Sequence, residues 1–465
     1  MGITPALPFD FTHAEATEIC INKVWIENLK GKIACVTSST AVVLVERGWG
    51  TLIGEQTDEE TMEPSSMKMQ DVPFASISVM AFGPDNVLFI GDSRDSKIVA
   101  IELGEATPNT ESESYNIFDL EGKISDYFQI EQSEIRVMDL KVHPQTKVAY
   151  LAVHVGFSQE KTSHILTIDV MGNLDEIDYS AFSSSSIDLV DPANEDIVFW
   201  GKTPARTLTI TDIDYHKGNI YLAGLSNEEF SSALRKIPYP FNGEYETSSI
   251  EMYHTTHNQM ETRAPIRTQA ILELNGVDSI IAGYTCTPMV TIPIDSLTDG
   301  ALVSGKTIAE IGYGNSPIDV LPFQAFSFSG EGSEPVLEEL VLVTNTHRGA
   351  ALFKVSDIEE FNQGEGLTTP SGFNPAGVEY LPVPLVGLLH VDDQDEQFIL
   401  GIQRDVESGD IDLKSFRKGL YFRLSEFINE YDFPSFQYPE GPDGEMMKGL
   451  QNMLISDEKL YDYLH

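Results

Sequence analysis

The feature that most constrains the fold is a repeat of strand-like runs along nearly the whole chain. Each copy reads as an apolar strand, a turn, a second strand that ends in small polar residues, and a third strand. The copies begin at Gly31, Ile77, Ile135, Leu208, Ile266, Pro317 and Leu385. Gly83-Pro84-Asp85-Asn86 and Asn275-Gly276 are turn sequences inside two of them. Repeats of this length with almost no helical periodicity predict an all-β repeat architecture.

Antiparallel units of three or four strands, repeated about seven times, predict a seven-bladed β-propeller. Closing the ring removes the unpaired sheet edge that an open array would present. We expect residues 1–424 to form this single domain, with the N-terminal strands completing the last blade. Residues 425–465 are expected to form a tail that packs on the propeller.

The charge of the chain restricts its partners. Lys and Arg total 29 against 73 Asp and Glu, a formal net charge of −44. Such a surface repels phosphates, so a nucleic-acid partner is not expected. With 41% apolar residues the chain has enough material for a large core, and no run approaches the roughly 18 apolar residues of a membrane span. The acidic excess favours an extracytoplasmic setting, where Cys20 and Cys35 either form a disulfide or stay as buried thiols; Met1 to Glu15 show no signal peptide.

Two runs carry a family resemblance. VLVTNTHRGAALFKV and VLFIGDSRDSKIVAIEL resemble the repeat of the Tyr-Val-Thr-Asn type and quinoprotein-dehydrogenase-like β-propellers. The resemblance implies a propeller fold and a periplasmic or secreted location. It leaves function open, because that superfamily includes redox enzymes, lyases and plain binding modules.

Arginine is scarce, and its distribution predicts an anion site. In a propeller, loops that leave second strands and loops that enter first strands open on one face. Six of the eleven arginines map to that face: Arg136, Arg206, Arg263, Arg267, Arg348 and Arg404. A guanidinium fork suits carboxylate, sulfate or phosphate groups, so these arginines, with Glu228 beside them, predict a site for an anionic small molecule. The alternative is structural, with the same arginines paired to acids such as Glu228, Glu261 and Asp92.

Two histidines and a carboxylate, His254, His257 and Glu261, occur within eight residues. Zinc and copper accept such donors, and His347, His154 or the thiol of Cys286 could complete the set. The neighbouring strand signals favour a loop over a helix here, and the alternative is a hydrogen-bonded surface pair. The acidic run from Asp405 to Asp412 loosely resembles a calcium loop but lacks the closing Glu.

Three functions fit this face. The first is a metal-dependent oxidoreductase or its accessory, with the histidines as ligands. The second is a lyase acting on acidic polysaccharides, in which Tyr253 or His254 abstracts a proton beside a carboxylate neutralised by Arg263 or Arg267. The third is a non-catalytic propeller that presents this face to a protein or a small anion. The chain has no G-x-S-x-G elbow, P-loop, dinucleotide fingerprint or C-x-x-C-H, which argues against serine hydrolase, nucleotide-driven and c-type cytochrome functions.

Overall fold

The computed structural model describes residues 74–156, 161–312, 315–327, 336–346, 349–372, 374–383, 385–405 and 408–418, a few residues between 436 and 448, and three N-terminal strands. Those strands, β1 (Val24–Asn28), β2 (Ile33–Val36) and β3 (Gly50–Ile53), form an antiparallel sheet of their own in the order β2-β1-β3. The predicted tail at 425–465 and Cys20 lie outside the described residues, apart from those few near the C-terminus.

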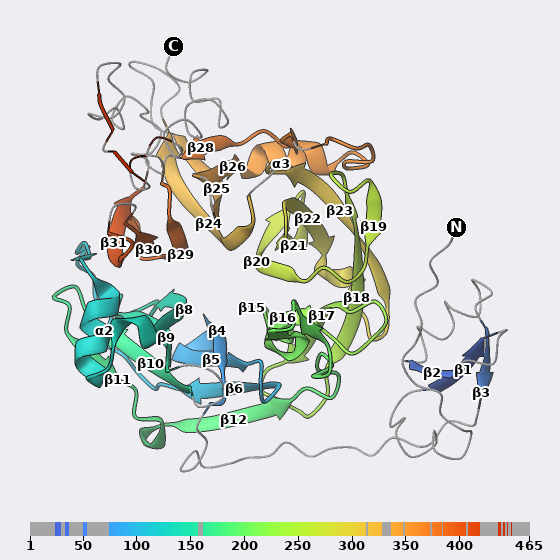
Figure 1. Ribbon diagram of the computed structural model, residues 1–465, viewed down its shortest axis with the longest axis horizontal. Helices are drawn as coiled ribbons and strands as arrows, with labels where there is room; N and C mark the ends of the chain where they lie inside the picture. Colours follow the sequence, from blue (N-terminus) through green and yellow to red (C-terminus); the bar gives the residue numbers. More distant parts are fainter. Residues whose placement is uncertain are drawn as a thin grey trace.

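The rest of the described chain is all-β and propeller-like, with few helices (Figure 1). Four separate four-stranded sheets are present, and we name each by its first strand. The β4 sheet comprises β4 (Ile77–Phe82), β5 (Val87–Asp92), β6 (Lys97–Glu102) and β12 (Ser183–Asp188). The β8 sheet comprises β8 (Ile135–Val142), β9 (Ala149–Val155), β10 (Thr162–Ile168) and β11 (Leu174–Glu176).

The other two separate sheets lie in the C-terminal half. The β24 sheet comprises β24 (Pro317–Ser327), β25 (Val336–Asn345), β26 (Ala350–Lys354) and β28 (Leu381–Val383). The β29 sheet comprises β29 (Leu388–Asp393), β30 (Phe398–Arg404), β31 (Ile411–Arg417) and β7 (Asn116–Ile117). Both are antiparallel throughout, as hairpin-connected strands require.

A ten-stranded sheet contains two further four-stranded units. The β15 sheet has β15 (Asp212–His216), β16 (Asn219–Leu225), β17 (Ser232–Pro238) and β18 (Glu246–His254); the β20 sheet has β20 (Ile266–Leu274), β21 (Val277–Tyr284), β22 (Pro288–Pro293) and β23 (Leu302–Glu310). Their outer strands β18 and β23 pair in parallel, which joins the two units. The short strands β19 (Gln259–Glu261) and β27 (Ala376–Gly377) pair with β18 and β23.

The six first strands stand side by side around a central axis, in the order β4, β15, β20, β24, β29, β8 and back to β4 (Figure 1). A buried apolar cluster fills each of the six seams between neighbouring sheets. Strands packed on both faces need apolar residues at successive positions, and β5 is buried along its entire length for this reason. The six described units match the predicted copies from Ile77 onward, whereas seven blades are not confirmed.

The order of the sheets around the ring differs from the order along the chain. The β8 and β15 sheets flank the β4 sheet on opposite sides, so the chain crosses from one side to the other. That crossing segment includes β12, which becomes the outer strand of the β4 sheet. The N-terminal strands were expected to complete the last blade; instead β7 pairs with β31 there, with Ile117 opposite Leu413.

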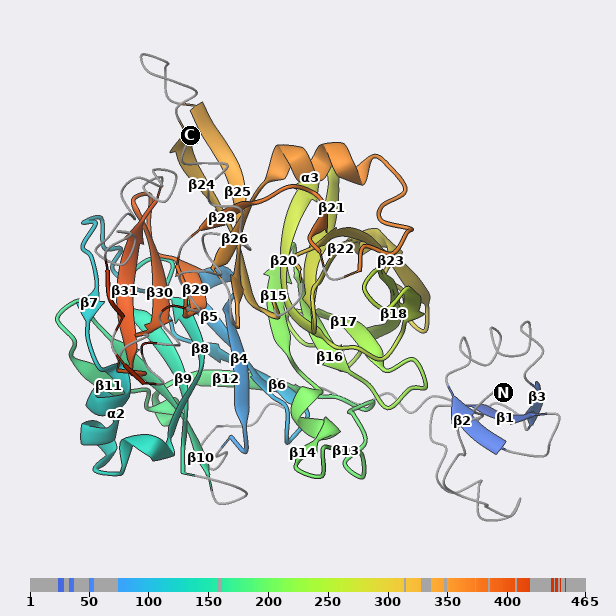
Figure 2. The ribbon, with the colours of Figure 1, turned by 45° about the horizontal axis from the view of Figure 1, so that its top comes forward.

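Helices occur only at the edges of the described sheets. Helix α2 (Leu120–Phe128) covers the seam between the β29 and β8 sheets, and the Asp119 side chain caps its first turn. Helix α3 (Val355–Asn362) packs against the β20 and β24 sheets, as Figure 2 shows. A short hairpin of β13 (Val198–Phe199) and β14 (Thr203–Pro204) follows β12. Single 3-10 turns occupy Pro84–Asn86, Gln132–Glu134, Tyr179–Ala181, Ala205–Leu208 and Ile294–Ser296.

The predicted turns form where the sequence placed them. The 3-10 turn at Pro84–Asn86 joins β4 to β5, and Asp85 and Asn86 have φ values of 53° and 60°. Asn275 and Gly276, with φ values of 53° and 79°, connect β20 to β21. Asn, Asp and Gly tolerate this left-handed backbone, which explains why these residues end the first strands.

Candidate functional site

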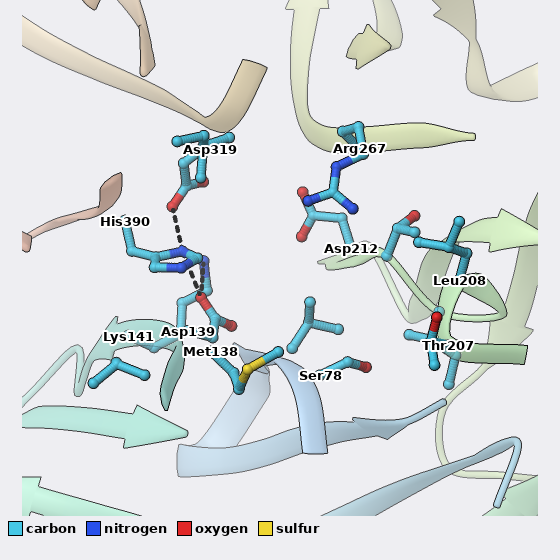
Figure 3. A pocket seen from close by; sticks show the side chains of 15 residues that line it. Ser78, Met138, Asp139, Lys141, Thr207, Leu208, Asp212, Arg267, Asp319 and His390 are labelled. Carbon is cyan, nitrogen blue, oxygen red and sulfur yellow. Dashed lines mark ion pairs between the residues drawn. The ribbon is translucent and has the colours of Figure 1, made fainter. Parts of the chain in front are cut away.

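A cavity of about 230 Å³ lies at the centre of the ring, lined by the first strands of the sheets (Figure 3). Its charged and imidazole side chains come from five of those strands and are Asp139, Lys141, Asp212, Arg267, Asp319 and His390. Ser78, Thr207 and Thr211 add hydroxyl groups, and apolar side chains complete the wall. The cavity is therefore polar and mixed in charge.

Four buried or half-buried aspartates link neighbouring first strands. Each accepts a backbone N–H from the next strand of the ring: Asp139 from Met80 at 2.6 Å, Asp212 from Gln269 at 2.6 Å, Asp319 from Val391 at 3.0 Å and Asp392 from Val142 at 2.6 Å. All four side chains therefore point in the same direction around the ring. Hydrogen bonds from backbone donors fix these carboxylates in place, so the cavity wall is preorganised.

Lys141 lies among these acids. Its Nζ is 4.0 Å from Oδ1 of Asp139, and four further carboxylates interact with it: Asp212, Asp214, Asp319 and Asp392. Burial alone would lower the pKa of Lys141, but the surrounding carboxylates raise it well above the usual value. The lysine is therefore held as a cation inside the ring.

The aspartates respond differently to this environment. Burial raises the pKa of Asp214 to about 7 and that of Asp392 to about 6, although Lys141 opposes both shifts. Burial also acts on Asp319, but there the charges of Lys141 and His390 outweigh it and lower the pKa. Among the described residues, Oδ2 of Asp214 is buried without a hydrogen-bond partner. Desolvation is thus the dominant cost in this region.

A second cluster joins the predicted metal residues at the outer strands of the β15 and β20 sheets. His254 ends β18, the residues after it form a turn, and Glu261 ends β19, opposite Met252. Cys286, with φ 95°, lies in the turn between β21 and β22. The His-Thr-Thr-His segment is therefore a turn between strands, as the sequence favoured.

The donors of this second cluster converge. Oε1 of Glu261 is 2.5 Å from Nδ1 of His257 and 3.2 Å from Nδ1 of His254. The two imidazole centroids are 4.0 Å apart. Ligand atoms of His254, His257 and Cys286 all lie within 4.8 Å of one another. We call His254, His257, Glu261 and Cys286 the rim cluster.

Burial differs within the rim cluster. His254 is fully buried, whereas the side chain of His257 is 47% exposed. Burial would lower the pKa of His254, but Cys286, Glu261 and Glu310 outweigh it and raise the pKa to about 9. Burial would raise the pKa of Glu261, yet hydrogen bonds from the two histidines lower it to about 2. Without a metal, the cluster therefore holds a protonated imidazole beside a carboxylate.

Glu310 supports the rim cluster from β23. It accepts hydrogen bonds from the Thr255 backbone at 2.9 Å, from the Thr255 hydroxyl at 3.0 Å and from the Thr287 hydroxyl. Its Oε1 is also 4.0 Å from Nε2 of His254. A single buried carboxylate thus ties the turn after β18 to the turn before β22.

The predicted arginines are spread over different places. Arg267 lines the central cavity. Arg206 bonds the Ala193 carbonyl and the Ser96 hydroxyl and pairs with Glu195; Arg263 pairs with Glu229; Arg136 bonds the carbonyls of Ser133 and Ile135; Arg404 bonds the Gly409 carbonyl. These contacts hold loops in place, and the acids among them, Glu195 and Glu229, differ from the Glu228, Glu261 and Asp92 that the structural alternative named. His347 and Arg348 lie outside the described residues.

The remaining candidates have local contacts. Tyr253 donates from its hydroxyl to Oδ1 of Asn258 at 2.7 Å. Glu228 is buried, and its backbone N–H donates to the Ser226 hydroxyl. Cys286 is a free thiol. In the acidic run after Asp405, the described backbone turns back on itself through Asp410, as a hairpin tip does.

The sequence analysis assigned the arginines and the histidines to one face, but the structure places Arg267 and the rim cluster in two separate locations. Arg267 lines the cavity from β20, the first strand of its sheet, whereas the rim cluster lies beside β22 and β23, the third and fourth strands. Strands are spaced about 4.8 Å apart, so the third strand of a sheet is roughly 10 Å from the first. None of His254, His257, Glu261 and Cys286 lines the cavity described here. One small molecule held by Arg267 in the cavity would not touch the imidazoles.

We call the central cavity and the first strands around it the channel. The sequence analysis missed the aspartates of the channel because it considered only unusual residues in loops. The signal was present inside the strands: DLKV, DIDY, PIDV and HVDD each place Asp in the otherwise apolar first strand of a copy. A carboxylate at a buried strand position needs a partner, and its recurrence across copies indicates a shared contact.

Comparisons with known proteins do not assign a family. The chain matches no protein-family model and no curated protein. Solved structures that it resembles include the PQQ-bound form of aldose sugar dehydrogenase from Streptomyces coelicolor, at 10% identity, TM-score 0.26, covering 76% of this chain and 98% of that one. Kuenenia stuttgartiensis hydrazine synthase follows at 11% identity, TM-score 0.30, covering 77% and 100%. Virginiamycin B lyase from Staphylococcus aureus has 10% identity, TM-score 0.25 and coverage of 77% and 98%.

At these values the likenesses carry no argument about function, and the propeller-like arrangement rests on the strand topology above. Among the helices of the described residues, none has the length and apolar character that crossing a membrane would require. Activity must therefore be argued from the two clusters themselves.

Proposed function

We propose that this protein binds a transition-metal ion, zinc or copper, at the rim cluster. The supporting observation is the convergence of ligand atoms from His254, His257 and Cys286 within 4.8 Å. Nitrogen and sulfur ligands lie about 2.0–2.3 Å from zinc, so donors on one ion are at most about 4.6 Å apart. Small side-chain rotations bring the three donors within that limit.

The donor set suits both metals. Two imidazoles and a thiolate leave zinc one position for a carboxylate or a water, and with water there the ion acts as a Lewis acid. The same trio with a weak fourth ligand is the set found in copper electron-transfer sites. Glu261 either supplies the fourth donor or orients the imidazoles as an outer carboxylate. The role that follows is a metal-dependent oxidoreductase or its accessory.

Access to the rim cluster supports an exchangeable or reactive metal. The exposed His257 side chain and the half-buried residue Cys286 offer an ion a path from solvent, while His254 is a fully buried ligand on the inner side. Glu310 and the threonines that bond to it hold the turns around the cluster. A small molecule approaching from solvent would meet the metal on the His257 side.

A location outside the cytoplasm belongs to the same proposal. Its support is the net charge of −44 and the resemblance of the repeats to periplasmic or secreted propellers. Fractionation of cells that make the natural protein tests the location separately from metal binding.

The test is metal titration of the full chain after treatment with a chelator. Wild type should bind one Zn²⁺ equivalent by calorimetry, and Co²⁺ should give the visible absorption of a thiolate complex. Replacing a ligand by Cys286→Ser or His257→Ala should weaken Zn²⁺ binding by about 100-fold or more, since even outer-shell changes cost 10–100-fold. Cu²⁺ addition, read by intense visible absorption, separates the copper from the zinc form.

The matched control is His164→Ala. His164 also places Nδ1 against a glutamate, Glu176 at 2.6 Å, but without the second histidine and the thiol. This variant should bind Zn²⁺ like wild type. A folded wild type that binds neither metal, or a Cys286→Ser variant with unchanged affinity, would refute the proposal. Retained binding of a protein partner by a metal-free variant would favour the non-catalytic alternative.

A further inference from the structure

The central cavity contains a second group of donors, independent of the rim cluster. Asp139 on β8, Asp319 on β24 and His390 on β29 place ligand atoms within 4.8 Å of one another. Nδ1 of His390 is 3.9 Å from Oδ1 of Asp139 and 3.8 Å from Oδ2 of Asp319 (Figure 3). Figure 3 shows the imidazole between the two carboxylates. Three first strands thus direct donors at one point.

We propose that Asp139, Asp319 and His390 bind one hard divalent cation of the Mn²⁺ type inside the channel. Two donors that share an ion at about 2.2 Å are at most about 4.4 Å apart, and both measured separations fall below that limit. The remaining pair, Asp139 and Asp319, places its donors within 4.8 Å of each other, so a small side-chain rotation is enough to seat the ion.

The carboxylates are already held in position for this role. Asp139 accepts backbone N–H groups from Met80 and Leu140, and Asp319 accepts them from Val320 and Val391. Each carboxylate oxygen keeps a lone pair after accepting one hydrogen bond. Outer donors that orient ligands in this way raise metal affinity.

The charge of the channel also favours a cation. Lys141 interacts with five first-strand carboxylates, Asp139, Asp212, Asp214, Asp319 and Asp392, and Arg267 is the other cation in the cavity wall. Carboxylates outnumber cations in this poorly solvated space, and burial favours the neutral form of several of them, with the pKa of Asp214 raised to about 7 and that of Asp392 to about 6. A buried negative charge is costly unless it is neutralised, and a divalent ion beside Asp139 and Asp319 would supply that charge.

The donor types select the class of ion. Two carboxylates and one imidazole are harder than the rim cluster, which includes a thiol, and Mn²⁺ accepts both oxygen and nitrogen donors. The cavity of about 230 Å³ has room for waters that complete a six-coordinate shell. Lys141, with Nζ 4.0 Å from Oδ1 of Asp139, limits the affinity by repulsion.

Mn²⁺ titration followed by electron paramagnetic resonance tests the proposal on the full chain, because bound Mn²⁺ loses the sharp signal of the free ion. Wild type should bind Mn²⁺, and both Asp319→Asn and His390→Gln should bind it at least tenfold more weakly. Pulsed measurements on His257→Ala, which lacks an exposed rim ligand, should still show coupling to an imidazole nitrogen, and the added change His390→Gln should abolish it.

Asp212→Asn is the matched control, because Asp212 lines the same cavity and bonds the next strand in the same way but stands outside the triad. It should keep the Mn²⁺ affinity within threefold. Wild type that leaves all Mn²⁺ free, an unchanged His390→Gln variant, or equal losses in Asp212→Asn and Asp319→Asn would overturn the proposal. If Asp319→Asn fails to fold, His390→Gln decides, since the His390 side chain is 20% exposed and less of the core depends on it.

Discussion

The channel and the rim cluster hold ionisable groups in two different ways. In the channel, aspartates extend from strands, and the backbone of the next strand fixes each carboxylate. In the rim cluster, turns between strands carry the histidines and the thiol, and one buried carboxylate, Glu310, ties those turns together. Strands make a rigid, desolvated wall, whereas turns make an accessible one. Substitutions should therefore cost more stability in the channel and change ligand access more at the rim.

The largest expected effect is from Lys141→Met in the channel. Removing the lysine that interacts with five carboxylates leaves Asp139 and its neighbours without their common cation, and losing one partner of a buried ion pair costs about 3–5 kcal/mol. Chemical denaturation at pH 7 measures the loss of unfolding free energy, which should shrink at pH 4 as the carboxylates become protonated. Lys217→Met is the control, because Lys217 is 67% exposed and pairs with Asp278 at the surface, where solvent screens the pair and little stability depends on it. Equal losses at both lysines would show that the channel charges are solvated.

Asp214→Asn should have the opposite sign and a pH dependence. The pKa of Asp214 is about 7 in the folded protein, above its usual 3.8, because burial disfavours the charged form. The contribution of this group to stability is therefore full below about pH 4 and is lost as pH rises through 7. The variant lacks that loss, so it should gain on wild type between pH 4 and pH 8, by on the order of 3 kcal/mol. Denaturant titrations across this range measure the difference, and a constant offset would contradict the assignment.

The smallest of the three effects is expected at the rim, from Glu310→Gln. The amide keeps one acceptor for the hydroxyl and backbone donors of Thr255 and Thr287 but loses the charge, which should cost about 1–2 kcal/mol. Glu338→Gln, at an exposed pair with Lys354, should cost less than about 1 kcal/mol. Thermal unfolding of the two variants compares them. A loss at Glu310 as large as that of Lys141→Met would remove the distinction between the two regions.

The sequence predicted the elements of the fold better than their order. The first strands that begin at Ile77, Ile135 and Ile266 form at those residues, because alternating apolar runs and Asn-Gly turns act locally. The placement of the β8 sheet beside the β29 sheet depends on contacts between segments far apart in the chain. Nothing in the local pattern specifies those contacts, so neither the number of sheets nor the outer strand β7 could be read from it.

The positions of the candidate residues could likewise be predicted only where their contacts are local. His254, His257 and Glu261 are close in sequence, so their meeting across one turn follows from local structure. Cys286 joins them because the β20 sheet packs beside β18. The spacing in the sequence does not determine this contact, but the rule that loops leaving second strands open on one face suggested it. The arginines were grouped only because their loops were expected on the same face of the propeller. That face is wide enough for them to lie in separate places with different contacts.

The outer strand of the β29 sheet comes from residues 116–117, while its partner β31 spans Ile411–Arg417. During synthesis, residues 116–117 emerge almost three hundred residues before β31, so this pairing cannot form until β31 has been made. Until then the two faces that meet at the seam under α2 remain open to solvent and to other chains. Closure of this seam therefore cannot precede synthesis of β31, and a chain truncated before residue 411 would leave its apolar cluster without the residues of β31.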